Sequence, residues 1–314
     1  MEQTFRKGDQ IGCYTVDKCI NKGGMAWVLK VHIRVGKYYA LKVSRCGVAK
    51  DQDDFNRIAI RDEAKLLSEL NHARIVRVYP VHRKDTDKVR EAVYYARLGD
   101  YWYFIMEHLS GDNLAHYIKT CGPLSVEEAC NIVGNVALGL FHLHSKDLVH
   151  MDVKAENVVF RSPVAKGEVF DPVLIDFGTA AGAIKFSDEA GSPYVMSPER
   201  LMAARGVAAP ETSQFMNPQK TEVWSVGVLL YQALTNHYPF PANDMRRLTS
   251  QIINDRPEPL SKSNAEVPAK LEQFILEGCL NKNPDHRPTM HEILVFLKPF
   301  GSGPVVARKS ASAV

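Results

Sequence analysis

The chain has 314 residues, of which 45% are hydrophobic and 24% are charged, so it can form one large domain or two modest ones. This composition excludes a disordered chain, a collagen-like repeat and a small disulfide-framed protein, and the net charge of +3 requires no nucleic-acid partner. Six scattered cysteines without a C-x-x-C pair, together with the lack of a signal peptide or a long apolar run, predict a cytoplasmic protein without membrane insertion.

The first third of the chain is rich in short β-type runs that one helix interrupts. Strands are expected at 12–21, 27–31, 37–43, 75–81 and 101–106. A helix is expected over 53–70, with an apolar face that includes Phe55 and Ile58. This part of the pattern predicts a small β-rich N-lobe over about residues 10–106.

The remainder of the chain is mostly helical in pattern. Two capping-box signatures, Ser125 with Glu128 and Thr289 with Glu292, each precede an apolar run at helical spacing. The apolar run 223–234 predicts a buried helix. We therefore expect a connection at about 107–113, a helical C-lobe over about 114–300 and a flexible tail at 301–314. The segments 83–100, 161–172 and 205–220 have the pattern of enlarged loops, and their role stays open.

Two features of the N-lobe could hold a nucleotide. Small residues in the run 20–28 would let backbone N–H groups approach phosphate oxygens, although an ordinary hairpin turn is the better explanation of this run taken alone. Lys42 ends the next apolar strand, and a buried ammonium needs a carboxylate partner. Glu63 on the following helix is a candidate for that partner, and the alternative is that both are solvated surface charges.

The C-lobe carries Asp152, Lys154 and Asn157 in one short run, and Asp176 follows in an Asp-Phe-Gly sequence. A carboxylate such as Asp152 can orient or accept a hydroxyl proton, and a lysine can neutralise a moving phosphoryl group. An Asn and a second Asp offer the hard oxygen ligands that Mg²⁺ prefers. Phosphoryl transfer needs little beyond positioning and charge neutralisation, so this order of residues indicates that chemistry.

Together these motifs resemble those of eukaryotic-type serine/threonine protein kinases over nearly all of residues 10–300, with features of bacterial or phage-borne members. The resemblance implies an α+β, bilobal protein-kinase fold. It implies Asp152 as the catalytic base, Lys154 as the partner of the γ-phosphoryl group, and Asn157 and Asp176 as Mg²⁺ ligands. The ATP-binding residues it implies are Ile20, Asn21, Gly23, Gly24, Met25, Ala26, Val28, Ala40, Lys42, Glu63, Met106, Glu107 and Leu109.

The resemblance also assigns roles outside the phosphate site. It makes Met106 the gatekeeper, with the carbonyl of Glu107 and the N–H of Leu109 binding adenine. It pairs Glu199 with Arg287 in a buried ion pair, and it makes residues 222–227 part of a helix that anchors the catalytic loop.

Two further contacts follow from the same resemblance. His150 is expected to stack on Phe177 and Leu67 without acting as an acid or a base. The Ser192 hydroxyl is expected to bind Asp152 and Lys154.

Four positions depart from the family pattern. Asn21 and Ala26 stand where glycines are usual, Met151 replaces the Arg of the His-Arg-Asp motif, and Glu222 replaces an Asp. Met151 matters most, because that Arg normally pairs with a phosphorylated residue of the activation segment.

The predicted function is ATP-dependent phosphorylation of Ser/Thr hydroxyls on proteins. One alternative is a pseudokinase that binds nucleotide as an interaction module. Met151 and the missing loop glycines favour it slightly, whereas the complete set of Lys42, Glu63, Asp152, Asn157 and Asp176 argues strongly against it. The other alternative is a small-molecule phosphotransferase, which Lys154 and the peptide-docking pattern of residues 191–199 disfavour. The substrate protein and the oligomeric state stay open.

Overall fold

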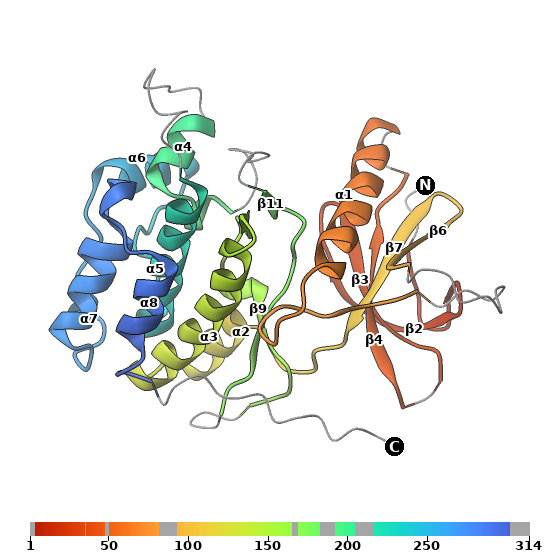
Figure 1. Cartoon of the computed structure of the whole chain (residues 1–314), viewed down its shortest axis with the longest axis horizontal. Helices are drawn as coiled ribbons and strands as arrows, with labels where there is room; N and C mark the ends of the chain where they lie inside the picture. Colours follow the sequence, from red (N-terminus) through yellow and green to blue (C-terminus); the bar gives the residue numbers. More distant parts are fainter. Residues whose placement is uncertain are drawn as a thin grey trace. The chain divides into compact units, whose positions relative to one another are not determined.

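The computed structural model describes residues 4–34, 36–47, 50–81, 93–164, 169–182, 192–204 and 217–301. The chain divides into two compact units, Met1–Ser110 and Gly111–Val314. As the sequence predicts, the first unit is rich in strands and the second is mainly helical (Figure 1).

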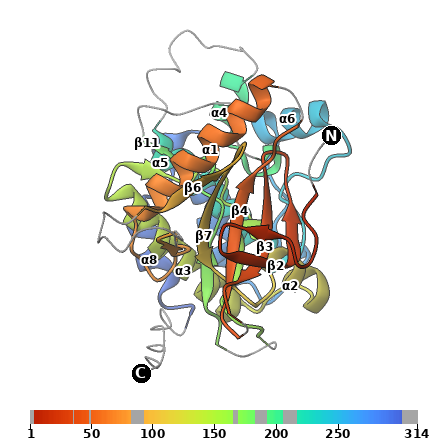
Figure 2. The same ribbon diagram turned by 90° about the vertical axis from the view of Figure 1, so that its right-hand side faces the viewer.

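The first unit is an antiparallel sheet with one helix. Its strands are β1 (Gln10–Ile11), β2 (Tyr14–Lys22), β3 (Ala26–His32), β4 (Tyr38–Ser44), β5 (Val78–Tyr79), β6 (Tyr95–Leu98) and β7 (Tyr101–Glu107). Their order is β1-β2-β3-β4-β7-β5, and β6 also pairs with β7. Helix α1 (Lys50–Ser68) packs on β4 and β7, as Figure 2 shows.

The alternation of side chains along β4 places the first half of the site. Leu41 and Val43 are fully buried in a core that Leu29 and Val31 of β3 share. Because successive side chains of a strand point to opposite faces, Lys42 projects from the other side of the sheet. That is the side on which Lys42 reaches Glu63 of α1.

The structure corrects two predictions in this unit. Phe55 and Ile58 are 58% and 50% exposed, and the buried face of α1 instead includes the polar residues Asn56 and Glu63. Asn56 donates to the carbonyl of Arg45 at 3.1 Å, so specific polar contacts set the orientation of α1, which hydrophobic periodicity does not reveal. The predicted loop 83–100 contains strand β6, and the predicted strand 75–81 is reduced to the two residues of β5.

The second unit contains helices, short helical turns and two small strand pairs. Its helices in the described part of the chain are α2 (Leu114–Cys121), α3 (Val126–His144), α4 (Pro198–Ala204), α5 (Pro218–Thr235), α6 (Met245–Asn254), α7 (Ala269–Gln273) and α8 (Met290–Leu297). Strand β9 (Val158–Phe160) pairs with β10 (Pro172–Leu174), and β8 (Leu148–Val149) pairs with β11 (Ala181–Gly182). The short turns are η1 (Ala155–Asn157), η3 (Pro193–Val195), η5 (Leu260–Lys262), η7 (Pro284–His286) and the π-helical η6 (Phe274–Cys279).

Helix α5 is the centre of this unit. It is buried on nearly all sides, as its apolar run predicts, and it packs against α3. Both predicted capping boxes are present at the starts of α3 and α8. Residues 83–92, 165–168 and 205–216 of the predicted loops, and residues 302–314 of the predicted tail, lie outside the described residues. No helix in the described part of the chain is both long enough and apolar enough to cross a bilayer.

The expected ion pair of Glu199 and Arg287 joins α4 to the segment before α8. It is bidentate, with nitrogen–oxygen distances of 2.7 and 2.8 Å, and Arg287 is only 1% exposed. Burial acts to raise the pKa of Glu199, but the hydrogen bonds and charge of Arg287 outweigh it, so this pKa lies below the ordinary value.

We expect Arg287→Met to lower the free energy of unfolding by about 3–5 kcal/mol, because it leaves a buried carboxylate without its partner. The wild-type contribution is fully present above the ordinary Glu pKa of 4.5 and is lost progressively as the pH falls from there through the lower folded-state pKa. Urea titrations at pH 7 and at a series of pH values below 4.5 measure both effects.

The matched control is Arg161→Met, which removes a half-exposed ion pair with Asp171 at 3.0 Å. A pair screened by water contributes at most about 1 kcal/mol, so this variant should remain close to the wild type. Equal losses in the two variants would contradict the structural importance of the Glu199–Arg287 pair.

Candidate active site

The first unit brings Lys42 and Glu63 together. The Nζ atom of Lys42 lies 2.8 Å from Oε1 and 2.7 Å from Oε2 of Glu63. Their side chains are 12% and 3% exposed, so this is a buried pair and the surface-charge alternative is wrong. Both carboxylate oxygens of Glu63 thus contact the ammonium group of Lys42 and fix its position.

The glycine turn follows directly on β2 and leads into β3. The N–H of Gly23 donates to the carbonyl of Ala26 at 2.9 Å. Arg45 follows β4, and its Nη1 donates to the carbonyls of Gly23 and Gly24 at 2.9 and 3.2 Å. Its backbone N–H donates to the carbonyl of Met25 at 2.8 Å. Arg45 therefore fixes the turn through its carbonyls, a role that no local sequence signal indicates.

The other predicted residues of this loop lie on the flanking strands. Ile20 and Asn21 are exposed on β2, Ala26 is buried, and Val28 is half-buried on β3. Val28 stands opposite Lys42 in the register of β3 and β4. The run 20–28 is thus a hairpin, and its turn consists of Gly23, Gly24 and Met25.

The residues predicted to hold adenine lie at β4 and the end of β7. Ala40 stands opposite Met106 in the sheet register. Glu107 ends β7, where its N–H donates to the carbonyl of Arg77 and its Oε1 accepts the N–H of Arg77, each at 2.9 Å. The half-buried Leu109 follows two residues later. These bonds engage the N–H of Glu107 with Arg77, and the role of the Glu107 carbonyl in binding adenine stays a prediction.

In the second unit, Asp152 is the centre of a hydrogen-bond cluster. Its Oδ2 accepts from Lys154 Nζ at 2.6 Å and from Asn157 Nδ2 at 3.0 Å. Its Oδ1 accepts from the backbone N–H of Ser192 at 2.8 Å, where the sequence indicated the Ser192 hydroxyl. Asp152 is only 6% exposed, so these donors hold both oxygens of an almost buried carboxylate.

Asn157 and Asp176 offer oxygens to a metal ion. Asn157 uses its amide nitrogen for the carbonyl and the carboxylate of Asp152, so its amide oxygen is directed to the opposite side. The N–H of Ile175 donates to the carbonyl of Asn157 at 3.0 Å, which places the next residue, the exposed Asp176, beside this loop.

Within the described ranges, no group of three or more His, Cys, Asp or Glu residues could hold a metal by itself. One amide and one carboxylate nevertheless fit Mg²⁺, which keeps waters and takes substrate phosphates as its further ligands.

The loop that carries Asp152 is anchored by Glu222 of α5. Glu222 Oε1 accepts the N–H groups of His150 and Met151 at 2.7 and 2.9 Å, and its Oε2 lies 2.7 Å from His144 Nε2. Burial acts to raise the pKa of Glu222, but the bonds and charges of its partners outweigh it and lower the pKa. Glu222 therefore acts as the predicted anchor, and His144 is a supporting residue that the sequence did not reveal.

Three residues that follow Asp176 in the chain bind three consecutive residues of the catalytic loop, residues 150–152. Thr179 Oγ1 donates to the carbonyl of His150 at 3.0 Å, and Arg200 Nη1 donates to that of Met151 at 2.9 Å. The Ser192 amide holds Asp152. Arg200 is 1% exposed, and its contribution was not predicted from the sequence.

His150 itself serves packing. Its ring meets that of Phe177 edge-on, with centroids 4.7 Å apart, and its Nε2 lies 3.0 Å from the carbonyl oxygen of Ile175. This confirms the predicted stacking of these two residues. Leu67, the third predicted member, is buried in the first unit.

Comparison with known proteins identifies the family. Residues 14–296 match the protein kinase domain. The chain is 28% identical over 282 residues to the serine/threonine-protein kinase PrkC of Bacillus subtilis, covering 88% of this chain and 38% of PrkC. It is also 28% identical over 282 residues to the serine/threonine-protein kinase PknB of Mycolicibacterium smegmatis, covering 87% of this chain and 40% of PknB.

The chain thus spans about two fifths of the length of these relatives. The match extends over both units, and it confirms the predicted protein-kinase fold. The chain belongs to the protein kinase domain family.

Proposed function

We propose that this chain is a serine/threonine protein kinase, which transfers the γ-phosphoryl group of ATP to Ser or Thr hydroxyls of proteins. The observation that carries the proposal is the Asp152 carboxylate held by Lys154 and Asn157. The names of PrkC and PknB support the same activity and the same acceptor residues.

The first unit contributes nucleotide binding. Lys42, oriented by Glu63, binds the α- and β-phosphates, and the backbone of the glycine turn covers the phosphates. The adenine ring lies against Ala40 and Met106 and is recognised by the backbone after β7. The intact Lys42–Glu63 pair disfavours the pseudokinase alternative, because a pure interaction module has no need of a buried ion pair that grips phosphate.

The second unit contributes the transfer chemistry. Asp152 orients the substrate hydroxyl and accepts its proton as the new oxygen–phosphorus bond forms and the bond to the bridging oxygen of ADP breaks. Lys154 neutralises the negative charge on the phosphoryl oxygens during the transfer. When bound, Mg²⁺ supplies further charge neutralisation at the phosphates, and Asn157 and Asp176 are the residues that would hold it.

The first test replaces each carboxylate by its amide. Asp152→Asn should lower kcat by about 10²–10⁴-fold while ATP still binds, because it removes the proton acceptor and retains the shape. Asp176→Asn should also weaken nucleotide binding in the presence of Mg²⁺. Initial rates with radiolabelled ATP and calorimetric titration of nucleotide measure the two effects.

Asp171→Asn is the control, because Asp171 pairs with Arg161 and belongs neither to the proposed catalytic residues nor to the proposed Mg²⁺ ligands. It should leave kcat within about 2-fold of the wild type, since a half-exposed pair contributes little. Full activity in Asp152→Asn would contradict the proposed role of Asp152.

The second test concerns substrate choice at Glu156. Glu156 is exposed, and it lies within electrostatic range of Tyr238, whose pKa is raised by burial and by the charge of Glu156. The ring of Tyr238 stacks on Tyr194 with centroids 4.8 Å apart. The exposed carboxylate of Glu156 can pair with a basic side chain of the substrate. Because such an exposed pair contributes at most about 1 kcal/mol, we expect a several-fold, salt-sensitive preference for Arg or Lys before the phosphorylated residue.

A peptide array with basic, neutral and acidic residues at each upstream position measures this preference. Glu156→Gln should abolish it, whereas Glu266→Gln, which changes an exposed residue elsewhere, should preserve it. An unchanged basic preference in Glu156→Gln would refute the assignment.

The third test concerns activation. Thr179, Ser192 and Arg200 hold the catalytic loop without any phosphate, and Met151 offers no positive charge to a phosphorylated residue. Phosphorylation would add about −1.5 to −2 charges that this loop does not neutralise. We therefore expect initial rates on an exogenous substrate to be the same for fully dephosphorylated and untreated protein.

Ser187→Ala, at a candidate phosphorylation site outside the described residues, should have the same initial rate as the wild type.

Arg200→Met removes the hydrogen bond to the carbonyl of Met151, so it should raise KM for the peptide and lower kcat. Arg200→Lys should restore part of both. A lag in the dephosphorylated enzyme that disappears on rephosphorylation would show that phosphorylation is the switch.

A further inference from the structure

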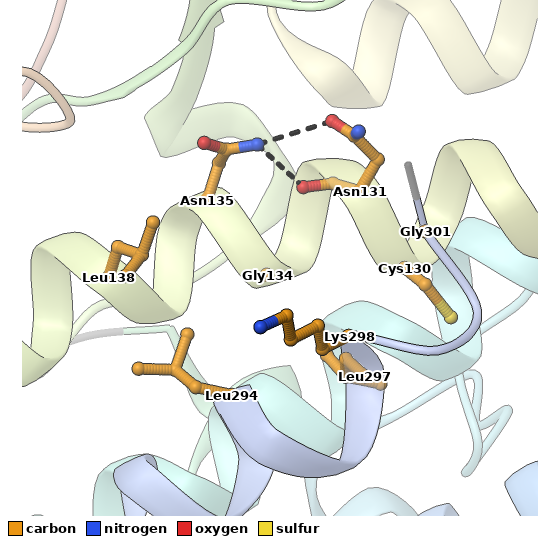
Figure 3. Close-up of a pocket in the computed structure, with 9 residues that line it drawn as sticks. All are labelled: Cys130, Asn131, Gly134, Asn135, Leu138, Leu294, Leu297, Lys298 and Gly301. Atoms are coloured by element: carbon orange, nitrogen blue, oxygen red, sulfur yellow. Dashed lines mark hydrogen bonds between the residues drawn. The ribbon is translucent and has the colours of Figure 1, made fainter. Parts of the chain in front are cut away.

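A pocket of about 190 Å³ lies in the second unit where α3 and α8 pack together. One face of α3, one face of α8 and the residue Gly301 line it, as Figure 3 shows. None of the residues assigned above to nucleotide, metal or catalysis lines this pocket, so it requires a separate explanation.

The floor of the pocket is bare backbone at Gly134. This residue lies inside the 19-residue helix α3, where Ala is a better helix former. A Cβ atom at Gly134 would meet nothing within 4 Å, so no neighbouring group requires glycine there. The glycine therefore leaves open a space that a side chain would fill.

The walls of the pocket are mostly apolar. Leu138 of α3 and Leu294 of α8 face it from opposite sides. Burial raises the pKa of the Cys130 thiol to about 12, so this group stays neutral at physiological pH. The amide nitrogen of Asn135 donates to the carbonyl and the side-chain oxygen of Asn131, at 2.9 and 3.2 Å, and is thus engaged within the protein.

Lys298 brings charge to the edge of the pocket. Of the described residues that line it, Lys298 alone is charged, and its side chain is exposed. Figure 3 shows its amino group extending over the pocket towards Gly134 and Leu294. No carboxylate pairs with this ammonium group within the described part of the chain.

We propose that this pocket binds a small apolar carboxylic acid. The alkyl or aryl part lies over Gly134 and between the leucines, and the carboxylate pairs with Lys298. An apolar cavity of about 150 Å³ accommodates benzene, so this volume suits a ligand of about seven to nine non-hydrogen atoms. A ligand of this size makes few contacts, and we expect a Kd of about 0.1–1 mM.

The other possible occupant is the chain itself. Residues 302–314 follow directly after Gly301, and they include the apolar pair Val305 and Val306. These valines carry no acid that could pair with Lys298, which is why the structure favours the small acid.

The experiment titrates the full chain with hexanoate, 1-hexanol and hexylammonium, and follows binding by saturation-transfer and protein-observed NMR. These probes share one alkyl chain and differ in the charge of the head group. We expect hexanoate to bind about 5-fold more tightly than hexanol, as one exposed charge pair allows, and hexylammonium to bind most weakly. The catalytic activity plays no part in this measurement.

Two variants and a control locate the site. Gly134→Leu should abolish hexanoate binding by filling the pocket, whereas Gly134→Ala should retain it. Lys298→Met should reduce the affinity for hexanoate to that for hexanol and leave hexanol unchanged. Lys262→Met, at an exposed lysine elsewhere, should bind all three probes like the wild type.

Three results would overturn the proposal. The first is equal affinity for the three probes, and the second is wild-type hexanoate binding in Gly134→Leu. The third is magnetisation transfer between the valine methyl groups of residues 305–306 and Leu294 in the free protein, because the chain itself would then fill the pocket.

Discussion

The catalytic loop depends on one buried carboxylate. Glu222 accepts the N–H groups of His150 and Met151 with a single oxygen, and its other oxygen is held by His144. Met151 has a φ of 71°, a conformation that costs a non-glycine residue about 1–3 kcal/mol. The two hydrogen bonds to a charged acceptor offset that cost, and they set the direction in which the next residue, Asp152, leaves the loop.

The position of Glu222 is fixed by the packed helices around it. Glu222 belongs to α5, which is buried on nearly all sides, and His144 ends α3, which packs against α5. Any displacement of these helices would expose apolar surface and break the buried hydrogen bond between His144 and Glu222 at the same time. The position of Asp152 is thus a consequence of helix packing in the second unit, and the same packing keeps Glu222 away from water.

The sequence was sufficient to predict the residues whose chemistry is encoded in short motifs. Asp152, Lys154 and Asn157 lie within six positions of one another, and the structure brings them together. Lys42 and Glu63 are farther apart, and the need of a buried ammonium for a carboxylate made Glu63 only a candidate partner, which the resemblance to protein kinases then favoured. The strands of the glycine hairpin followed from the alternation of apolar residues and from the small residues at the turn.

Contacts between distant segments were not predictable in this way. Arg45 and His144 lie in runs without any motif, and Arg200 lies just after the motif that ends at Glu199. Each acts on a carbonyl or a carboxylate that belongs to another segment. The error at Phe55 and Ile58 has the same origin. A helix whose buried face contains Asn56 and Glu63 hides its orientation from any argument based on hydrophobic periodicity.

The departures from the family pattern coincide with these unpredicted contacts. A turn with fewer glycines is held through its carbonyls by Arg45, and a longer carboxylate at position 222 still reaches His144 and the loop. Where Met151 replaces an arginine, a buried guanidinium from Arg200 binds the carbonyl of that same methionine. The positive charge of Arg200 therefore lies at the catalytic loop. Its Nη1 is bound to the backbone carbonyl of Met151 in the protein interior. Because that bond needs no phosphate, the order of the loop is a property of the folded chain itself.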